Sequence, residues 1–283
     1  MTKQVLLGVC FLMLATSVLA QNFLSATLND RYYSAYAGVG FASYRGELKH
    51  NGSFQNEVSN YTVGTEVRLL SKLSARVELS RYSIRGHDKH APDSSFAKQR
   101  NLSFESTNYE ATVQGVFYLR KYRGVYHKRW GLDPYLAIGI GTTFISPQAK
   151  LGETYFNLYE LKTEDKEYSR LTLIIPAAAG LKWKLNSNVN FITEIAYRYT
   201  FSDYLDDVSG NFPESYPDAT TEILSNRKDE IGVINEEAYA QLTAGNARGE
   251  SNNKDAYLFL NLKLEIFLSK DMFKPKPKPS KRQ

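Results

Sequence analysis

The chain has 283 residues, and its formal net charge of +5 at pH 7 is unevenly distributed. Six positive charges belong to Lys3 and to the last ten residues (Lys274, Lys276, Lys278, Lys281 and Arg282), so the rest of the chain is close to neutral and gives no support for nucleic-acid binding. The single cysteine, Cys10, lies in the apolar leader, which excludes a disulfide framework and a thiol nucleophile from the remainder.

Residues 1–20 contain one lysine, then an apolar run, then small residues. This pattern predicts a secretory signal peptide that is cleaved after Ala20, with Val18 at the −3 position. Lipidation of Cys10 is a less favoured alternative, because the three residues before it fit a lipobox poorly. Beyond the leader no run approaches about 18 apolar residues, so no transmembrane helix is expected.

Alternation of apolar and polar residues between turn signals predicts eight β-strands. They are expected at residues 32–42, 60–70, 73–84, 107–121, 134–145, 169–185, 189–202 and 256–268. Arg and Glu recur in the middle of these strands, as in LSARVELS and VNFITEIAYRYT, on the face opposite the apolar side chains. Behind a secretion signal, this pattern favours strands with lipid outside and a polar barrel interior. A soluble sandwich would instead turn its charged face to water.

The connections between the predicted strands alternate in length. Strands two and three, and strands six and seven, are joined by two or three residues, and a moderate connection covers 122–133. The long connections are 43–59, 85–106, 146–168 and 203–255. Outer-membrane barrels have short periplasmic turns, longer extracellular loops and an even number of strands. The sequence therefore predicts an all-β, antiparallel up-and-down barrel of the cell outer membrane over 21–268. A further hairpin within 210–253 would make ten strands.

Charged residues of both signs are predicted to face the barrel interior: Glu66, Arg68, Arg76, Glu78, Glu110, Glu194 and Arg198. Side chains fill the interior of an eight-stranded barrel. An unpaired buried charge costs several kcal/mol, so these residues are expected to pair across the lumen. The prediction is a packed ionic core, which disfavours an open channel.

Three local features depart from simple alternation. Pro176 cannot donate a ladder hydrogen bond and predicts a bulge or local break in its strand. Small residues at Gly139, Gly141 and 177–179 would leave room for large interior side chains opposite them. In the last strand, Phe267 falls on the face opposite the apolar side chains unless a bulge intervenes.

No catalytic constellation is present: G-x-S-x-G, H-E-x-x-H and a glycine-rich phosphate loop are all missing. The prediction is therefore a non-enzymatic protein without catalytic, cofactor-binding or metal-binding residues. His87 and His90 could ligate a metal together with Asp88, although solvated loop residues are the favoured interpretation. An enzyme with its site in the long loops stays a disfavoured alternative.

The densest acidic segment carries Asp203, Asp206 and Asp207, directly after the seventh predicted strand. Carboxylates clustered in a loop can hold calcium, but the spacing does not match an EF-hand. Ordinary capping of the loop by these aspartates is favoured.

Residues 269–283 alternate lysine and proline, which predicts an extended, solvated periplasmic tail. A second interpretation is a basic arm that contacts an acidic partner, peptidoglycan or anionic head groups.

Five segments resemble the PorG family, a small outer-membrane barrel of the type IX secretion system of Bacteroidota. They are YRGEL (44–48), LSARVELSRYSIRGHD (73–88), RNLSFES (100–106), PYLAIGIGTTFISPQAK (134–150) and YRYTFSDYLDDVSG (197–210). The resemblance covers about 33–268, and YTFSDYLDDVS is its most specific part.

The resemblance implies a non-enzymatic component that associates at its periplasmic side with the ring of the lipoprotein PorK and its partner PorN. The machine exports proteins that carry a C-terminal signal domain. The resemblance assigns no individual binding residues and does not account for the lysine- and proline-rich tail. A small porin or transport barrel is the alternative function.

Overall fold

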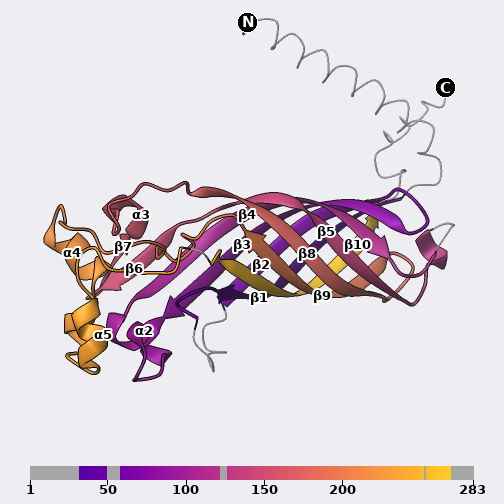
Figure 1. The fold of residues 1–283 in the computed structure, drawn as a ribbon. Helices are drawn as coiled ribbons and strands as arrows, with labels where there is room; N and C mark the ends of the chain where they lie inside the picture. Colours follow the sequence, from indigo (N-terminus) through magenta and orange to yellow (C-terminus); the bar gives the residue numbers. More distant parts are fainter. Residues whose placement is uncertain (1–31, 50–57, 122–125, 252, 269–283) are drawn as a thin grey trace, which may run out of the picture.

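Eight long strands form the body of the protein. The computed structural model describes residues 32–49, 58–121, 126–251 and 253–268; the predicted signal peptide and the 269–283 tail lie outside these residues. The strands are β1 (Tyr33–Arg45), β2 (Val58–Arg68), β3 (Leu73–His87), β4 (Ser103–Tyr118), β5 (Leu132–Phe144), β8 (Leu171–Lys184), β9 (Val189–Thr200) and β10 (Ala256–Leu268). Each pairs antiparallel with its neighbours in this order, and β1 pairs with β10, so the sheet closes into a barrel (Figure 1).

The predicted eight-stranded, up-and-down barrel is confirmed. The short turns lie at one end and the long connections at the other (Figure 1). The largest boundary differences are in β1, which ends at Arg45, and in β3 and β4, which continue as a paired hairpin to His87 and Ser103. This extension carries the two strands into the loop region.

The ten-stranded alternative is wrong. The segment 210–253 forms α4 (Ala219–Ser225), η5 (Lys228–Glu230) and α5 (Glu236–Gln241), with one isolated bridge between Asn211 and Ala247. An unpredicted hairpin occurs instead in the preceding long connection, as β6 (Pro147–Leu151) and β7 (Thr154–Asn157). It extends the sheet from the first residues of β4, at Glu105 and Ser106, and does not enter the barrel wall.

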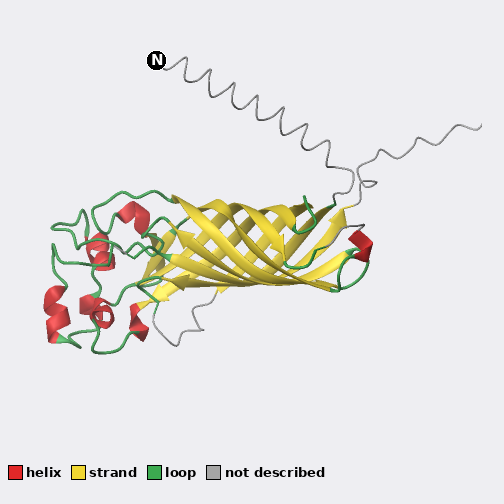
Figure 2. Ribbon diagram, turned by 45° about the vertical axis from the view of Figure 1, so that its right-hand side comes forward, coloured by secondary structure: helices red, strands yellow, loops and turns green. Residues whose placement is uncertain are grey.

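The long connections fold into a cap over one end of the barrel, as Figure 2 shows. Besides the β6–β7 hairpin, α4, η5 and α5, the cap contains η3 (Asp88–His90), α2 (Phe96–Arg100) and α3 (Leu158–Leu161). Polar side chains start these short helices: Ser95, Asp218 and Asn235 accept hydrogen bonds from backbone N–H groups of α2, α4 and α5. A further short helix, η4 (Tyr126–Lys128), lies in the β4–β5 turn. Among the described residues, no helix has the length and apolar character needed to span a membrane.

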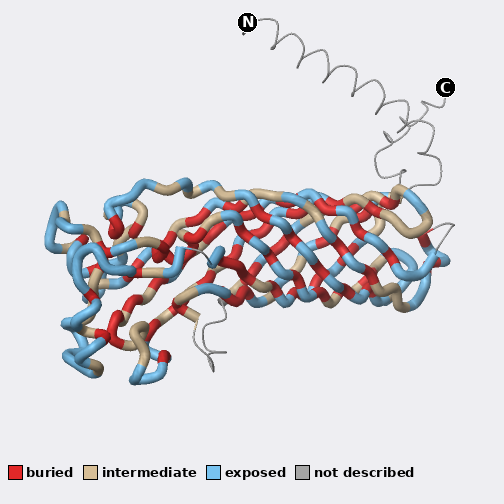
Figure 3. Tube along the Cα trace, in the orientation of Figure 1, coloured by how far each residue is buried: buried red, intermediate tan, exposed pale blue. Residues whose placement is uncertain are grey.

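Buried and exposed residues alternate along the barrel strands (Figure 3). The charged residues at the middle of the strands are buried, and the outer surface is mostly apolar. Exposed residues on its outer surface include Val39, Val63, Leu79, Val113, Ile140 and Leu262. Soluble monomers rarely expose contiguous apolar surface larger than a few hundred Å². An apolar belt around a polar interior is the arrangement of a barrel that spans a bilayer.

The structure explains the irregular positions in β5, β8 and β10. Pairing of β5 with β8 stops between the partners Ile138–Ala177 and Gly141–Ile174, with the same register on both sides. Pro176 therefore marks a local break and adds no bulge. Phe267 lies on the interior face, with no bulge in the β1–β10 register, and its ring stacks on Tyr126 at a centroid distance of 4.6 Å.

The small residues in β5 and β8 divide between the two faces. Gly139 faces the interior beside Gln114, whose Cγ would lie 2.8 Å from an added Cβ. Ala178 also faces inward, whereas Ala177 and Ala179 are exposed on the outer face. Only part of this group therefore makes room for interior side chains.

Candidate functional site

A chain of ion pairs occupies the middle of the barrel. Lys263 Nζ lies 2.6 Å from a carboxylate oxygen of Glu78 and 2.8 Å from one of Glu194. Arg76 Nη1 lies 2.6 Å from the other Glu194 oxygen, and all four side chains are at most 2% exposed. Tyr135 adds a hydrogen bond of 2.7 Å to Glu194. Each charge therefore has a partner of opposite sign.

Further ion pairs fill the barrel toward both ends. On the cap side, Arg198 contacts Glu110 at 3.0 Å and Glu78 at 3.2 Å. On the turn side, Lys182 contacts Glu265 at 2.8 Å and Glu66 at 3.4 Å. These interactions fill the lumen along its length.

The predicted ionic core is confirmed for six of the seven predicted interior charges, which are buried and form ion pairs. Arg68 is also buried, but it donates to the Ser71 carbonyl and lies over the Tyr118 ring, and it forms no ion pair within the described residues.

Lys182, Lys263 and Glu265 complete the pairing, and the sequence pattern did not predict these three interior charges. A signal for two of them was present: Lys263 and Glu265 alternate with apolar residues along β10. In β8, the run of apolar residues hid Lys182.

The aspartates after β9 hold the cap to the barrel. The hydroxyl oxygen of Tyr44, in β1, lies 2.7 Å from carboxylate oxygens of both Asp206 and Asp255. Asp203 accepts a hydrogen bond of 2.8 Å from Ser209, and Asp207 accepts one of 2.8 Å from the Tyr168 hydroxyl. These contacts favour the capping interpretation. Among the residues that the structure describes, no group of three or more His, Cys, Asp or Glu side chains is arranged to hold a metal ion.

Asp88 does not join His87 and His90 in a ligand set. Arg100 donates to both Asp88 oxygens, at 2.8 and 3.0 Å, and the backbone N–H of Leu102 donates to one of them. The rings of His87 and His90 lie edge to face with centroids 6.4 Å apart. Asp88 therefore forms an ion pair that fixes α2 against the end of β3.

Two arginines connect the separate cap loops. Arg100 donates to the carbonyl of Arg248 at 2.6 Å, and Arg248 in turn contacts Glu164 at 3.0 Å. Arg248 also donates to the carbonyls of Ser225 and Asp207. Both arginines are buried, so they order three loops that are distant in the sequence.

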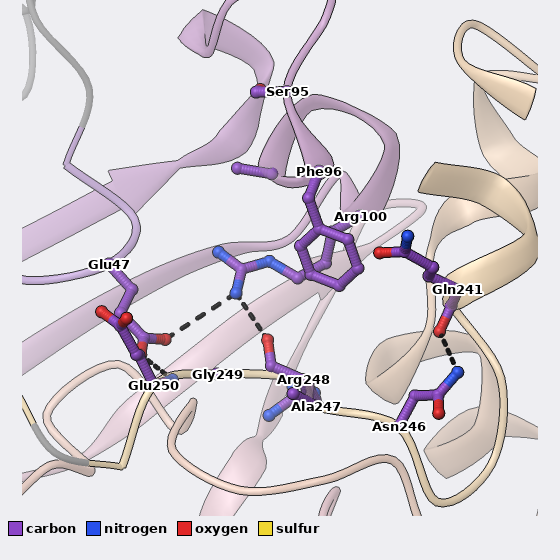
Figure 4. Close-up of a pocket in the computed structure, with 11 residues that line it drawn as sticks. Glu47, Ser95, Phe96, Arg100, Gln241, Asn246, Ala247, Arg248, Gly249 and Glu250 are labelled. Carbon is purple, nitrogen blue, oxygen red and sulfur yellow. Dashed lines mark hydrogen bonds and ion pairs between the residues drawn. The ribbon is translucent and has the colours of Figure 1, made fainter. Parts of the chain in front are cut away.

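A cleft of about 720 Å³ opens on the cap beside these arginines (Figure 4). It is lined by Glu47, Ser95, Phe96, Ala97, Arg100, Gln241, Asn246, Ala247, Arg248, Gly249 and Glu250. Its size is within the range of small-ligand sites. Burial raises the pKa of Glu47 to about 7, although Arg100 and the N–H of Glu250 oppose the shift.

The closed antiparallel wall, the ionic interior and the apolar exterior define a small transmembrane β-barrel. Residues 68–221 match the family described as "Domain of unknown function (DUF6089)". The match covers more than half of the chain, and the protein belongs to this family. No functionally curated protein matches it significantly.

Several solved barrels are similar in fold. Neisserial surface protein A has a TM-score of 0.43 and 10% identity, with 83% of this chain and 96% of that chain covered. A major outer membrane protein from Thermus thermophilus has a TM-score of 0.41 and 13% identity, covering 84% and 99%. The attachment invasion locus protein Ail of Yersinia pestis has a TM-score of 0.38 and 10% identity, also covering 84% and 99%.

Proposed function

We propose that this protein is a non-enzymatic outer-membrane barrel of the type IX protein secretion system. It anchors or scaffolds a periplasmic ring of PorK and PorN type during protein export. The filled lumen supports a scaffold rather than a channel, because Lys263, between Glu78 and Glu194, occupies the space that a channel would need. The secretion role rests on the sequence resemblance, above all on YTFSDYLDDVS at 199–209.

The outer surface supports insertion in the outer membrane. Exposed aromatic side chains follow the apolar belt at both ends: Phe117, Trp130 and Trp183 near the turns, and Tyr109, Phe144, Tyr199 and Phe201 near the cap. Aromatic girdles of this kind mark the two interfaces of outer-membrane barrels. The short turns at one end and the long loops at the other support an orientation with the turns in the periplasm and the cap outside the cell.

The segment 199–209 has a structural role that suits a scaffold. It leaves β9 and passes between the barrel and the cap, where Leu205 and Val208 are buried. Its aspartates bind Tyr44 of the barrel and Tyr168 of the cap. The most specific part of the resemblance therefore keeps the outer end of the barrel in one arrangement.

The turn end supports association with an acidic partner. Arg120, Lys121 and Lys128 are exposed there, in the β4–β5 connection. The tail at 269–283 adds further lysines and arginine after β10. Positive charge at this rim favours encounter with an acidic surface of a periplasmic protein.

Deletion of the gene tests the secretion role. Export of proteins with the C-terminal signal domain should be lost, and the full-length chain supplied in trans should restore it. Affinity purification from native outer membranes should recover the PorK- and PorN-type proteins, and recovery should fall when Arg120, Lys121 and Lys128 are changed to glutamine. Unchanged export in the deletion strain would contradict the proposal.

A small porin is the second candidate function, and conductance separates it from a scaffold. The purified barrel in a planar bilayer should show no steady open channel, because ion pairs fill its interior. A variant that changes Arg76, Glu78, Glu194 and Lys263 together to alanine should conduct if it folds. A steady conductance of the unchanged protein would favour the porin.

A further inference from the structure

The cap cleft lies between a helix and the edge of a short paired segment. One wall of the cleft is α2, where Phe96 is half-buried at the surface. The other wall is the segment 246–250 (Figure 4). The buried ion pair of Arg100 with Asp88 fixes α2, and the bond from Arg100 to the Arg248 carbonyl joins the two walls. The cleft is therefore held open by bonds made within the cap.

The segment 246–248 is paired on one side only. Phe212 N–H donates to the Asn246 carbonyl at 2.9 Å, and Arg248 N–H donates to the Gly210 carbonyl at 2.8 Å. These bonds flank the bridge between Asn211 and Ala247, so the N–H and C=O of Ala247 point to the opposite side, where Ala247 lines the cleft. Within the described residues, neither group of this exposed residue has a hydrogen-bond partner. A free strand edge can pair with another chain.

One end of the cleft is acidic. Glu47 Oε1 accepts the backbone N–H of Glu250, while Glu47 Oε2 is buried against Gly249 and makes no hydrogen bond within the described residues. The closest guanidinium nitrogen, Arg100 Nη1, is 3.7 Å away and belongs to a side chain already bonded to Asp88. The exposed carboxylate of Glu250 lies at the same end. This end favours a positively charged group.

We propose that the cleft is a peptide-binding groove, in which an extended polypeptide segment adds a strand at Ala247 and places a basic side chain beside the exposed carboxylate of Glu250, at the end of the cleft that Glu47 also lines. Addition of an extended peptide between a strand edge and a helix is a common recognition mode, in which backbone bonds give affinity and side-chain pockets give specificity. Phe96 supplies an apolar surface for a neighbouring side chain. The proposal concerns the outer end of the barrel and is independent of the secretion role.

Binding can be measured with the full-length barrel in phospholipid nanodiscs. The probe is a fluorescein-labelled library of extended seven-residue peptides with lysine at the centre and Thr or Val elsewhere, followed by fluorescence anisotropy. Replacing the central lysine by glutamate should abolish binding. N-methylation of the residue that pairs with Ala247 should weaken it about tenfold, the effect of one lost hydrogen bond. The N-methyl peptides require no change in the protein.

Substitutions in the cleft provide a second test of the proposal. Ala247→Pro removes the free N–H and should weaken binding about tenfold, whereas Ala247→Ser keeps it and should bind as the unchanged protein does. Glu250→Gln should weaken lysine peptides about threefold, and Glu153→Gln, on the exposed β6–β7 turn, should have no effect. No anisotropy change up to about 1 mM peptide, or binding insensitive to both N-methylation and Ala247→Pro, would overturn the proposal. A labelled neutral oligosaccharide that binds in the cleft and is not displaced by the peptides would assign the cleft to a different ligand and equally overturn it.

Discussion

Arg198 and Glu110 form an ion pair inside the barrel, with 3.0 Å between Nε and Oε1 and no exposed surface on either side chain. Arg198 comes from β9 and Glu110 from β4, so the pair crosses the lumen between strands that are not neighbours. Tyr257 of β10 donates to the same carboxylate at 2.6 Å. Contacts of this kind join opposite walls of the barrel.

Removing one member of this pair should strongly destabilise the barrel. Arg198→Met leaves the charge of Glu110 buried without an ion-pair partner, while Glu78 keeps its contact with Lys263. Breaking a buried pair in this way costs about 3–5 kcal/mol. Urea unfolding in detergent, followed by the fluorescence of Trp130 and Trp183, measures the loss. The double variant Arg198→Met/Glu110→Gln should recover part of it.

The matched control for this prediction is the exposed pair of Lys150 and Glu153 on the β6–β7 turn. Lys150→Met should change the free energy of unfolding by less than about 1 kcal/mol, because solvent screens the pair. An equal loss of stability in Lys150→Met and Arg198→Met would contradict an ionic core.

Gly180 should not tolerate a side chain. It faces the interior, and an added Cβ would lie 2.3 Å from the Tyr135 ring. Gly180→Ala should destabilise the barrel by about 1–3 kcal/mol through overpacking, measured by the same unfolding assay. Gly115→Ala is the control, because its Cβ would meet no atom closer than 3.9 Å. Shortening the ring residue with Tyr135→Leu should make Gly180→Ala less harmful.

A positively charged side chain should be tolerated on the inner face of β10 and should destabilise the barrel on its outer face. Leu262 lies at mid-strand on the outer face, and its neighbour Lys263 is buried in the lumen with two carboxylates. Leu262→Arg should cost about 2–4 kcal/mol, the penalty for a basic residue facing lipid near the bilayer midplane. Folding yield into liposomes of known lipid composition measures this penalty. Lys263→Arg should reduce the folding yield far less. A larger loss in Lys263→Arg than in Leu262→Arg would contradict the assignment of Leu262 to lipid and Lys263 to the lumen.

The cap should loosen as pH rises. Burial raises the pKa of Asp255, just before β10, from 3.8 to about 8 in the folded protein. The folded state therefore binds the proton more tightly than the unfolded state. This contribution to stability is complete below about pH 4, where both states are protonated, and is lost as pH rises through about 8.

Limited proteolysis of the cap between pH 5 and 9 tests this pH dependence. Cleavage in the loops should increase toward pH 9, and Asp255→Asn should reduce the change. Asp93→Asn, at an exposed position, should leave the pH profile as it is. A cap that became more resistant with rising pH would contradict the assigned sign.

The strands were predictable because successive residues of a membrane barrel face two different environments. Residues such as Val77 and Glu78 alternate between lipid and lumen, and this alternation located all eight barrel strands. The cap was not predictable in the same way. Its helices are short, from three to seven residues, and are held by capping side chains and by Arg100 and Arg248 rather than by a long amphipathic pattern.

The sequence by itself determined the barrel, the positions of its eight strands and seven of its interior charges, because period-two alternation is a local property of the chain. Only the tertiary structure decided which charges meet. The position of Lys263 between Glu78 and Glu194 depends on the closure of β1 on β10 and on the register of several strands. The cleft beside Ala247 likewise depends on loops more than a hundred residues apart, brought together by buried arginines. Such long-range contacts leave no periodic signal, and three-dimensional packing alone defines them.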